Sequence, residues 1–292
     1  MTNPQATQQV EGPRPVMVRP QSLAVTCIEM LRDDTVLWPA TGLLYRYGQD
    51  LALVTNWHVF SGINPITREV RGTPNRVKFH INVFDQPGRA GGKFHARPVD
   101  LQLIVNDTPI WWYHPYDKLQ VDISVLRLND QIADFEEIKE RVTSLPATMM
   151  VVDYGTENMR ATYAYPFVGS DVFILGYPLG LTKQGIFPIW KRGSIASEPF
   201  YDLVDAPVIL VDALTREGMS GSPVLYFGNV LATTEGQDAF GPPSSEPWLV
   251  GVYAGREGVT KEEVDMALGR VWKRHLLDEI FHYNGRATQP GD

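Results

Sequence analysis

The stretch TREGMSGSPVL, Thr215–Leu225, decides how the chain is interpreted. It places Ser220 between two glycines, Gly218 and Gly221, and an apolar run begins at Pro223. Two explanations fit these letters. The glycines can simply make a tight turn before a buried strand, or they can hold the serine as a nucleophile on a turn whose N–H groups face a reacting oxygen. The rest of the chain decides between them.

Composition sets the class of protein. The 292 residues are 43% hydrophobic, enough for one large domain or two half-domains. The 25 glycines and 22 prolines are typical of many short strands joined by turns. The formal charge of −8 argues against a nucleic-acid partner. The single cysteine, Cys27, excludes an intramolecular disulfide and a cysteine-rich metal site, and we expect it to be a small buried residue in a strand.

The chain shows no targeting or membrane-spanning pattern. Residues 1–20 are polar and proline-containing, without the apolar region and cleavage site of a secretory signal, so we expect a flexible tail. No apolar run reaches the roughly 18 residues that a membrane span needs. These features predict a cytoplasmic protein that does not bind membranes, and a disulfide-free secreted protein exported by another route is the alternative.

Strand patterns dominate residues 21–128. Apolar runs on either side of the turn Tyr47–Asp50 predict a hairpin within residues 40–60. Residues 77–84 alternate between apolar and polar, as a half-buried strand does. Further strands are expected over 22–31 and 120–128. The aromatic loop PIWWYHP, residues 109–115, is expected to pack between two β-barrels rather than to line a cleft.

The pattern changes at residue 129. Apolar residues at helical intervals predict a connector helix within 129–165; they are Ile132, Phe135, Ile138 and Val142. Strand patterns then resume over 166–272. The strands expected there cover 171–180, 186–197, 206–214, 222–228, 248–255 and 268–272. Residues 273–283 place their apolar side chains on one face, which predicts an amphipathic helix within a C-terminal segment of residues 273–292.

This order of elements predicts the fold class. Strands and helices do not alternate regularly, so a parallel sheet is disfavoured. We predict an all-β fold of two antiparallel six-stranded β-barrels with a connector helix and a C-terminal α-helix. The first barrel would cover residues 21–128 and the second residues 166–272.

Three residues suggest acyl-transfer chemistry. His58 follows the apolar run LVTNW at a strand end, Asp122 opens the strand DISVLRL, and Ser220 lies in GMSGSP. A nucleophile, a base that takes its proton and a carboxylate that orients the base are the parts that such a site needs. The order His, Asp, Ser argues against an α/β-hydrolase, which runs Ser, acid, His.

The same segments resemble a known family. TNWHV, VDISVL and GMSGSP are similar to the three signature segments of the chymotrypsin-like, or trypsin-like, serine peptidases. The resemblance is to the disulfide-poor bacterial branch that includes glutamyl endopeptidases and the high-temperature-requirement proteases. ATGLLY, ILGYPLG and VGVYAGR also resemble segments of that branch, so the similarity covers residues 22–283.

The resemblance implies a role for each residue. Ser220 would be the nucleophile, His58 the general base and then acid, and Asp122 the orienting carboxylate. The N–H groups of Gly218 and Ser220 would form the oxyanion hole, and glycine permits a peptide orientation that a β-carbon would obstruct. The implied activity is that of a serine endopeptidase that cleaves a protein or peptide substrate through an acyl-enzyme, with no metal and no cofactor.

The resemblance also places substrate-binding residues on two stretches. They are Leu214, Thr215 and Arg216 on one side and Tyr253, Ala254 and Gly255 on the other. Leu214 at the expected base of the pocket leaves no carboxylate to select Lys or Arg. Thr215 resembles a polar residue of the glutamate-selective relatives, but Tyr253 stands where they use a histidine. A small or apolar residue before the cleaved bond (P1) is therefore favoured over an acidic one.

The sequence departs from the family pattern at one position that bears on regulation, and it leaves alternative functions open. Met219 stands where family members activated by cleavage carry an acidic residue, so activity should not require N-terminal trimming. A protease inside a cell needs restraint, which suggests a regulatory protein partner. A catalytically silent double barrel, used as a binding or scaffold module, is the alternative function, and an esterase on the same fold is a third. The complete set of His58, Asp122 and Ser220 favours the endopeptidase.

Overall fold

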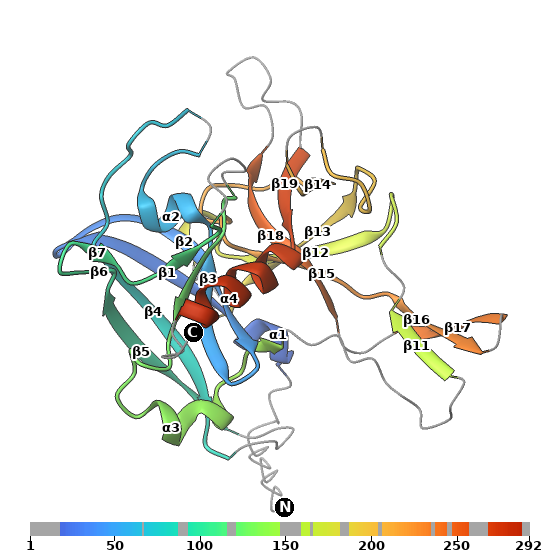
Figure 1. Ribbon diagram of the computed structural model, residues 1–292, viewed down its shortest axis with the longest axis horizontal. Helices are drawn as coiled ribbons and strands as arrows, with labels where there is room; N and C mark the ends of the chain where they lie inside the picture. Colours follow the sequence, from blue (N-terminus) through green and yellow to red (C-terminus); the bar gives the residue numbers. More distant parts are fainter. Residues whose placement is uncertain are drawn as a thin grey trace, which may run out of the picture.

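The computed structural model describes most of the chain. The described residues are 18–65, 67–86, 93–115, 121–146, 159–163, 166–181, 187–203, 206–234, 237–243, 247–256 and 268–287. The expected N-terminal tail lies almost entirely outside them. Figure 1 shows two β-rich halves, with helix α4 (His275–Ala287) running from the C-terminal half across the N-terminal half. None of the helices in the described part is long and apolar enough to span a bilayer.

The N-terminal half is one eight-stranded sheet with the order β5-β4-β1-β2-β3-β9-β8, and β10 pairs with β2. Only β10 is parallel to its neighbour. The strands of the sheet are β1 (Val25–Arg32), β2 (Thr35–Tyr47), β3 (Asp50–Thr55), β4 (Arg76–Phe84), β5 (Phe94–Gln102), β8 (Trp112–Tyr113), β9 (Ser124–Arg127) and β10 (Leu145–Pro146). A short helix, α1 (Pro20–Leu23), precedes it, and β6 (Ile104–Val105) pairs with β7 (Thr108–Pro109) beside it.

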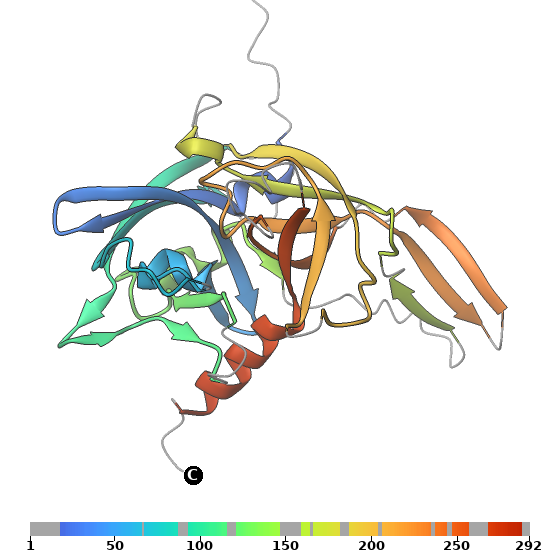
Figure 2. The same cartoon turned by 90° about the horizontal axis from the view of Figure 1, so that it is seen from above.

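The predicted closure of this half into a six-stranded barrel is not seen. Among the described residues, the strands at the two ends of the order, β5 and β8, do not pair with each other. Strand β8 is only two residues long, and β5 carries Pro98, which cannot donate a ladder hydrogen bond and suits an edge strand. The first half is therefore a curved open sheet in the described residues (Figure 2).

The predicted hairpin is confirmed, with Tyr47 opposite Asp50 and a positive φ of 57° at Gly48. The next segment differs from the prediction. His58 does not end a strand: it lies in the short helix α2 (Trp57–Ser61), which follows β3 after Asn56. A helix of five residues is too short to leave a periodic signal in the sequence.

The connector helix is much shorter than predicted. It consists of α3 (Phe135–Ile138) and the 3-10 turn η1 (Lys139–Arg141). The four residues that suggested a helix, Ile132, Phe135, Ile138 and Val142, are nevertheless all buried in the core of the N-terminal sheet. The spacing correctly predicted which side chains face the core, because a turn, a short helix and an extended residue can present the same face.

The C-terminal half contains a closed barrel with the order β12-β13-β14-β19-β18-β15. Its strands are β12 (Asp171–Gly176), β13 (Ile189–Ile195), β14 (Val208–Asp212), β15 (Pro223–Tyr226), β18 (Trp248–Arg256) and β19 (Leu268–Lys273). Each lies within a predicted strand range or extends it by one residue, so this barrel is confirmed. The 3-10 turn η2 (Pro178–Gly180) follows β12.

A small sheet was not predicted. It joins β11 (Met159–Tyr163), β16 (Asn229–Thr234) and β17 (Gln237–Pro243), and it projects away from the barrel in both Figure 1 and Figure 2. Its strands fall in the connector and in the segment between β15 and β18, where the sequence showed no strand pattern.

One core cluster joins the two halves and α4. It contains Val25 and Leu43 from the sheet, Tyr177 and Val252 from the barrel, and Leu277 from α4. The aromatic loop, expected between two barrels, packs against α4: Trp112 lies edge-on to Phe281 of α4 with ring centroids 5.9 Å apart, and the buried His114 contacts Glu279 at 2.8 Å. The two halves are thereby fixed against each other along one seam.

Candidate active site

His58 and Asp122 are held together by two hydrogen bonds. The main-chain N–H of His58 donates to Asp122 Oδ1 at 2.8 Å, and His58 Nδ1 lies 2.7 Å from Asp122 Oδ2. The carboxylate is 2% exposed and the imidazole 20% exposed. Asp122 lies just before β9 rather than at its start. Because an ionised carboxylate only accepts hydrogen bonds, Nδ1 carries the proton in this arrangement.

Ser220 lies on the other side of the imidazole. Its Oγ is 3.2 Å from His58 Nε2. With the proton on Nδ1, Nε2 is left as an acceptor for the serine hydroxyl. The three predicted residues therefore form one continuous chain of hydrogen bonds from Asp122 through His58 to Ser220. His58 and Ser220 are 162 positions apart in the sequence.

The turn that carries Ser220 depends on its two glycines. Gly218 and Gly221 have φ values of +88° and +87°, a region that L-residues with side chains rarely adopt. A β-carbon on Gly218 would lie 2.4 Å from the carbonyl oxygen of Tyr177, and one on Gly221 would lie 2.1 Å from that of Thr41. The two glycines that flank Met219 and Ser220 are thus required because neighbouring backbone approaches the turn closely.

Thr41 supports this turn from the N-terminal sheet, a role the sequence did not reveal. Its hydroxyl donates to the carbonyl of Gly218 at 2.7 Å and accepts from the N–H of Tyr177 at 3.0 Å. Its own N–H donates to the carbonyl of Ser220 at 2.9 Å. One fully buried side chain therefore fixes the turn against both halves of the molecule.

Asn56 is a second support that the sequence did not single out. Its Nδ2 donates to the carbonyl oxygen of Asp122 at 2.7 Å, and the residue is fully buried between β3 and α2. Asn56 thus holds the main chain of Asp122, while His58 binds the carboxylate of the same residue. Its only signal in the sequence was its place in TNWHV.

The turn also presents main-chain donors. Among the residues that the structure describes, the N–H groups of Gly218 and Ser220 donate to no carbonyl, whereas the N–H of Met219 donates to the carbonyl of Arg216 at 3.3 Å. The Met219 side chain is fully buried in the core of the barrel. Met219 stands where cleavage-activated relatives carry an acidic residue, and here apolar packing anchors the turn at that position. The amide groups of Gly218 and Ser220 are thus left without a carbonyl acceptor among the described residues.

The predicted substrate-binding residues fall into two groups. Leu214 and Arg216 are exposed, and Ala254 and Gly255 are partly buried. Thr215 and Tyr253 are each 1% exposed, and their hydroxyl groups are hydrogen-bonded to each other.

The Tyr253 side chain connects the two predicted substrate-binding stretches through its hydrogen bond with Thr215. A β-carbon on Gly269 would lie 2.3 Å from Cε2 of the Tyr253 ring, so the ring packs directly on that glycine. Burial raises the pKa of the phenol above its ordinary value, and the hydrogen bond with Thr215 and the charge of Arg256 act in the opposite direction. The phenol is therefore neutral at ordinary pH.

Solved structures with similar folds share little sequence with this chain. They include the inactive form of Rv3671c from M. tuberculosis, at 19% identity and a TM-score of 0.41, covering 97% of this chain and 99% of that one. The serine endoprotease from Yersinia pestis has 14% identity and a TM-score of 0.48, covering 92% of this chain and 65% of that one. A Glu endopeptidase in complex with MPD has 14% identity and a TM-score of 0.46, covering 90% and 91%.

No curated protein matches the chain. The family model of the trypsin-like peptidase domain matches residues 40–231, a range that includes His58, Asp122 and Ser220. The family expected from the three signature segments is thereby confirmed. The chain belongs to the trypsin-like peptidase family.

Proposed function

We propose that this trypsin-like peptidase is a serine endopeptidase that works through an acyl-enzyme on Ser220. The hydrogen-bonded chain from Asp122 through His58 to Ser220, with contacts of 2.7 and 3.2 Å, is the observation that carries the proposal. Nucleophile, base and orienting carboxylate stand in the order that acyl transfer requires.

The first half of the proposed reaction forms the acyl-enzyme. Ser220 Oγ attacks the carbonyl carbon of the scissile peptide bond while His58 Nε2 takes the hydroxyl proton. The Asp122 carboxylate stabilises the imidazolium that results. The developing oxyanion accepts hydrogen bonds from the N–H groups of Gly218 and Ser220, donors that typically contribute 10²–10³ in rate each. His58 then gives its proton to the leaving amine.

The second half releases the product. Water attacks the ester carbonyl with His58 again acting as base, and Ser220 Oγ leaves with the proton. Because His58 must be neutral to accept a proton, kcat/KM should fall on acidification. A flat profile down to about pH 5 would contradict this role.

We further propose that the enzyme prefers a small P1 residue. The buried ring of Tyr253 and its hydrogen-bonded partner Thr215 occupy the region between the two predicted pocket walls. A large P1 side chain would have to displace a fully buried ring, which a small one need not do. This supports a small residue over both an acidic and a large apolar one.

Hydrolysis by a matched pair of serine variants tests the proposed activity. Ser220→Ala should lower kcat on a fluorogenic peptide by about five to six orders of magnitude. Ser222→Ala is the control, because the Ser222 hydroxyl is fully buried and, among the described residues, makes no hydrogen bond. It should keep wild-type activity. Equal activity in all three proteins would overturn the assignment, and hydrolysis of esters without peptides would favour the esterase.

A further inference from the structure

Two peptide groups meet at Gly218, and each of them is held by its carbonyl oxygen. The carbonyl of Glu217 accepts a hydrogen bond from the N–H of Leu179 at 2.6 Å. The carbonyl of Gly218 accepts one from the Thr41 hydroxyl at 2.7 Å. Because a trans peptide points its C=O and its N–H in opposite directions, the N–H of Gly218 points away from Leu179. Glycine has a wide choice of backbone conformations, so this direction depends on the two contacts.

The Thr41 hydroxyl is committed to this task. Its one proton goes to Gly218, and its oxygen accepts a hydrogen bond from the buried N–H of Tyr177 at 3.0 Å. Gly176 leaves the room that the hydroxyl needs, since a β-carbon there would lie 2.8 Å from Thr41 Oγ1. A side chain of the same shape without the hydroxyl would leave the Gly218 carbonyl and the Tyr177 N–H without these partners.

The main chain of Thr41 is anchored as well. Thr41 lies in β2 opposite Cys27 of β1, and its carbonyl accepts a buried hydrogen bond from the Thr55 hydroxyl at 2.8 Å. Its N–H donates to the carbonyl of Ser220 at 2.9 Å. Thr55 ends β3, the strand that leads to α2 and His58. Thr41 therefore joins the strand that leads to the general base to the turn that carries the nucleophile.

We propose that Thr41 is a positioning residue of the oxyanion hole. Its hydroxyl keeps the N–H of Gly218 directed at the oxygen of the reacting carbonyl. This role rests on the proposed function, because it concerns the same transition state. The N–H of Gly218 binds most strongly when that oxygen becomes charged, so the contact matters more in the transition state than in the bound substrate. Loss of the Thr41 hydroxyl should therefore lower kcat far more than it changes KM.

Thr41→Val removes the hydroxyl and keeps the branched shape. We expect kcat on a fluorogenic peptide to fall about 10- to 100-fold, no more than the loss of an oxyanion donor itself. KM should change by less than about threefold. Thr41→Ser restores the hydroxyl and should return kcat to within about threefold of the wild-type value. Wild-type kcat in Thr41→Val, or no rescue in Thr41→Ser, overturns the proposal.

Inhibition by a peptide aldehyde reports on the oxyanion hole directly. Ser220 Oγ adds to the aldehyde carbon, His58 takes the hydroxyl proton, and the former carbonyl oxygen becomes the oxyanion. Because this adduct resembles the transition state, its inhibition constant should rise in Thr41→Val by about the same 10- to 100-fold that kcat/KM loses. The corresponding peptide alcohol cannot form the adduct and should bind both proteins equally. An aldehyde that inhibits both proteins equally contradicts the proposal.

Thr26 provides a matched control in β1. Its hydroxyl also donates to a carbonyl, that of Cys27 at 3.3 Å, and also accepts from a main-chain N–H, that of His80 at 3.2 Å. Neither partner belongs to the turn that carries Ser220. Thr26→Val should therefore lower the melting temperature, as Thr41→Val does, while kcat stays within about twofold of wild type. Equal losses of kcat in the two variants would mean that Thr41 acts on stability alone, which overturns the proposal.

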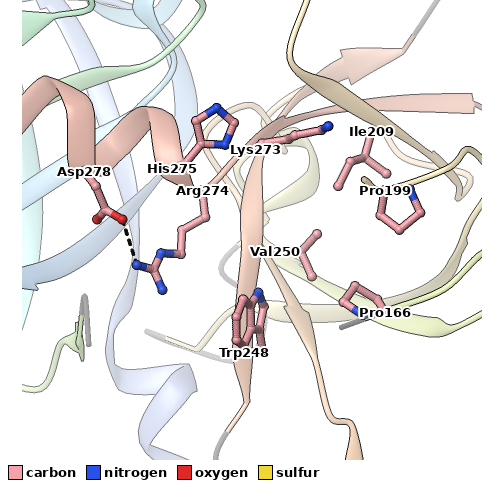
Figure 3. A pocket seen from close by; sticks show the side chains of 9 residues that line it. All are labelled: Pro166, Pro199, Ile209, Trp248, Val250, Lys273, Arg274, His275 and Asp278. Atoms are coloured by element: carbon pink, nitrogen blue, oxygen red, sulfur yellow. Dashed lines mark hydrogen bonds and ion pairs between the residues drawn. The ribbon is translucent and has the colours of Figure 1, made fainter. Parts of the chain in front are cut away.

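A second control weakens the contact between the two halves away from the turn. Asp278 of α4 forms an ion pair with Arg274 at 2.7 Å, and Figure 3 shows this pair beside a cavity at the start of α4. Asp278 also accepts a hydrogen bond from the hydroxyl of Tyr45 in β2 at 3.4 Å. Asp278→Ala removes both contacts, and kcat should stay within about twofold of wild type. A loss as large as that in Thr41→Val would show that loosening of the two halves, rather than the hydroxyl, lowers kcat.

The outcomes separate the role of Thr41 from the proposed function. A wild-type protein without Ser220-dependent hydrolysis would overturn both. Wild-type hydrolysis that Thr41→Val leaves unchanged would overturn only the role of Thr41. Should Thr41→Val fail to fold, as judged by circular dichroism, Thr41→Ala takes its place with the same expected losses, since it also removes the hydroxyl.

Discussion

Asp122 holds His58 by two hydrogen bonds, one to the main chain at 2.8 Å and one to the ring at 2.7 Å. The carboxylate thereby fixes both the position of the helix turn that carries the imidazole and the orientation of the ring. With Nδ1 bound to Asp122, the ring presents its other nitrogen, Nε2, to Ser220.

Asp122→Asn should reduce kcat by about 10⁴ while leaving the fold intact. An amide can donate to Nδ1, which moves the ring proton to Nε2 and removes the acceptor for the Ser220 hydroxyl. The measurement is kcat together with the circular dichroism spectrum. Asp171→Asn is the control, since Asp171 is an exposed partner of Arg192, and it should retain full activity. A loss of less than about tenfold in Asp122→Asn would argue against the assigned tautomer.

Gly218→Ala should lower kcat by about 10²–10³, because its β-carbon would lie 2.4 Å from the Tyr177 carbonyl and the turn with its two N–H donors must shift. Gly169→Ala is a matched control. Gly169 has a φ of +85° but nothing within 4 Å of an added β-carbon, so it carries the same backbone strain without the clash. It should lose about 1–2 kcal/mol of stability and no activity. Similar activity losses in both variants would mean that strain alone is responsible.

Tyr253→Ala should widen the range of P1 residues. Removing the buried ring opens space beside Thr215, so the ratio of kcat/KM for a P1 phenylalanine to that for a P1 alanine should rise by about 10²-fold, at a stability cost of about 3–5 kcal/mol. Tyr253→Phe keeps the ring and removes only the hydroxyl, and its specificity should match wild type. An unchanged P1 profile in Tyr253→Ala would place the pocket elsewhere.

Cys27 should react slowly with iodoacetamide in the folded protein. Burial, aided by the Glu29 carboxylate, raises the pKa of its thiol to about 11. The folded state therefore favours the protonated thiol. The associated stability is present below pH 9.0, the ordinary value, and is lost as pH rises through about 11. Alkylation should accelerate over the same range, whereas urea-unfolded protein should react readily at about pH 8. Equally fast reaction of folded and unfolded protein at that pH would contradict the shift.

Periodicity in the sequence predicted most of the fold where strands are long and half-buried. All six strands of the C-terminal barrel were expected in place. The sheet of β11, β16 and β17 was missed because segments such as NVLATTEGQDAFGPP show no regular alternation and end in turn residues. Closure of the first half was predicted from the number of strands, whereas it depends on the edge strands, and β8 has only two residues and β5 carries Pro98.

Of the candidate site, only the residues proposed to take part in the reaction could be predicted from the sequence. His58, Asp122 and Ser220 are residue types with a recognisable role and order. Thr41 and Asn56 act through main-chain contacts, and the Thr41 hydroxyl meets the Gly218 carbonyl across 177 residues of sequence. No local pattern encodes such a contact. The sequence also did not show that Thr215 and Tyr253 are almost completely buried. The cytoplasmic location and the regulatory partner stay predictions.

Labelling with a fluorophosphonate probe is the most direct test of the central claim, that His58 activates Ser220. Mass spectrometry of the wild-type protein should place the adduct on Ser220, while Ser220→Ala should take up none and Ser222→Ala should label fully. His58→Ala should slow labelling by at least about 10³-fold. An adduct on another residue, or labelling that proceeds unchanged without His58, would contradict the account.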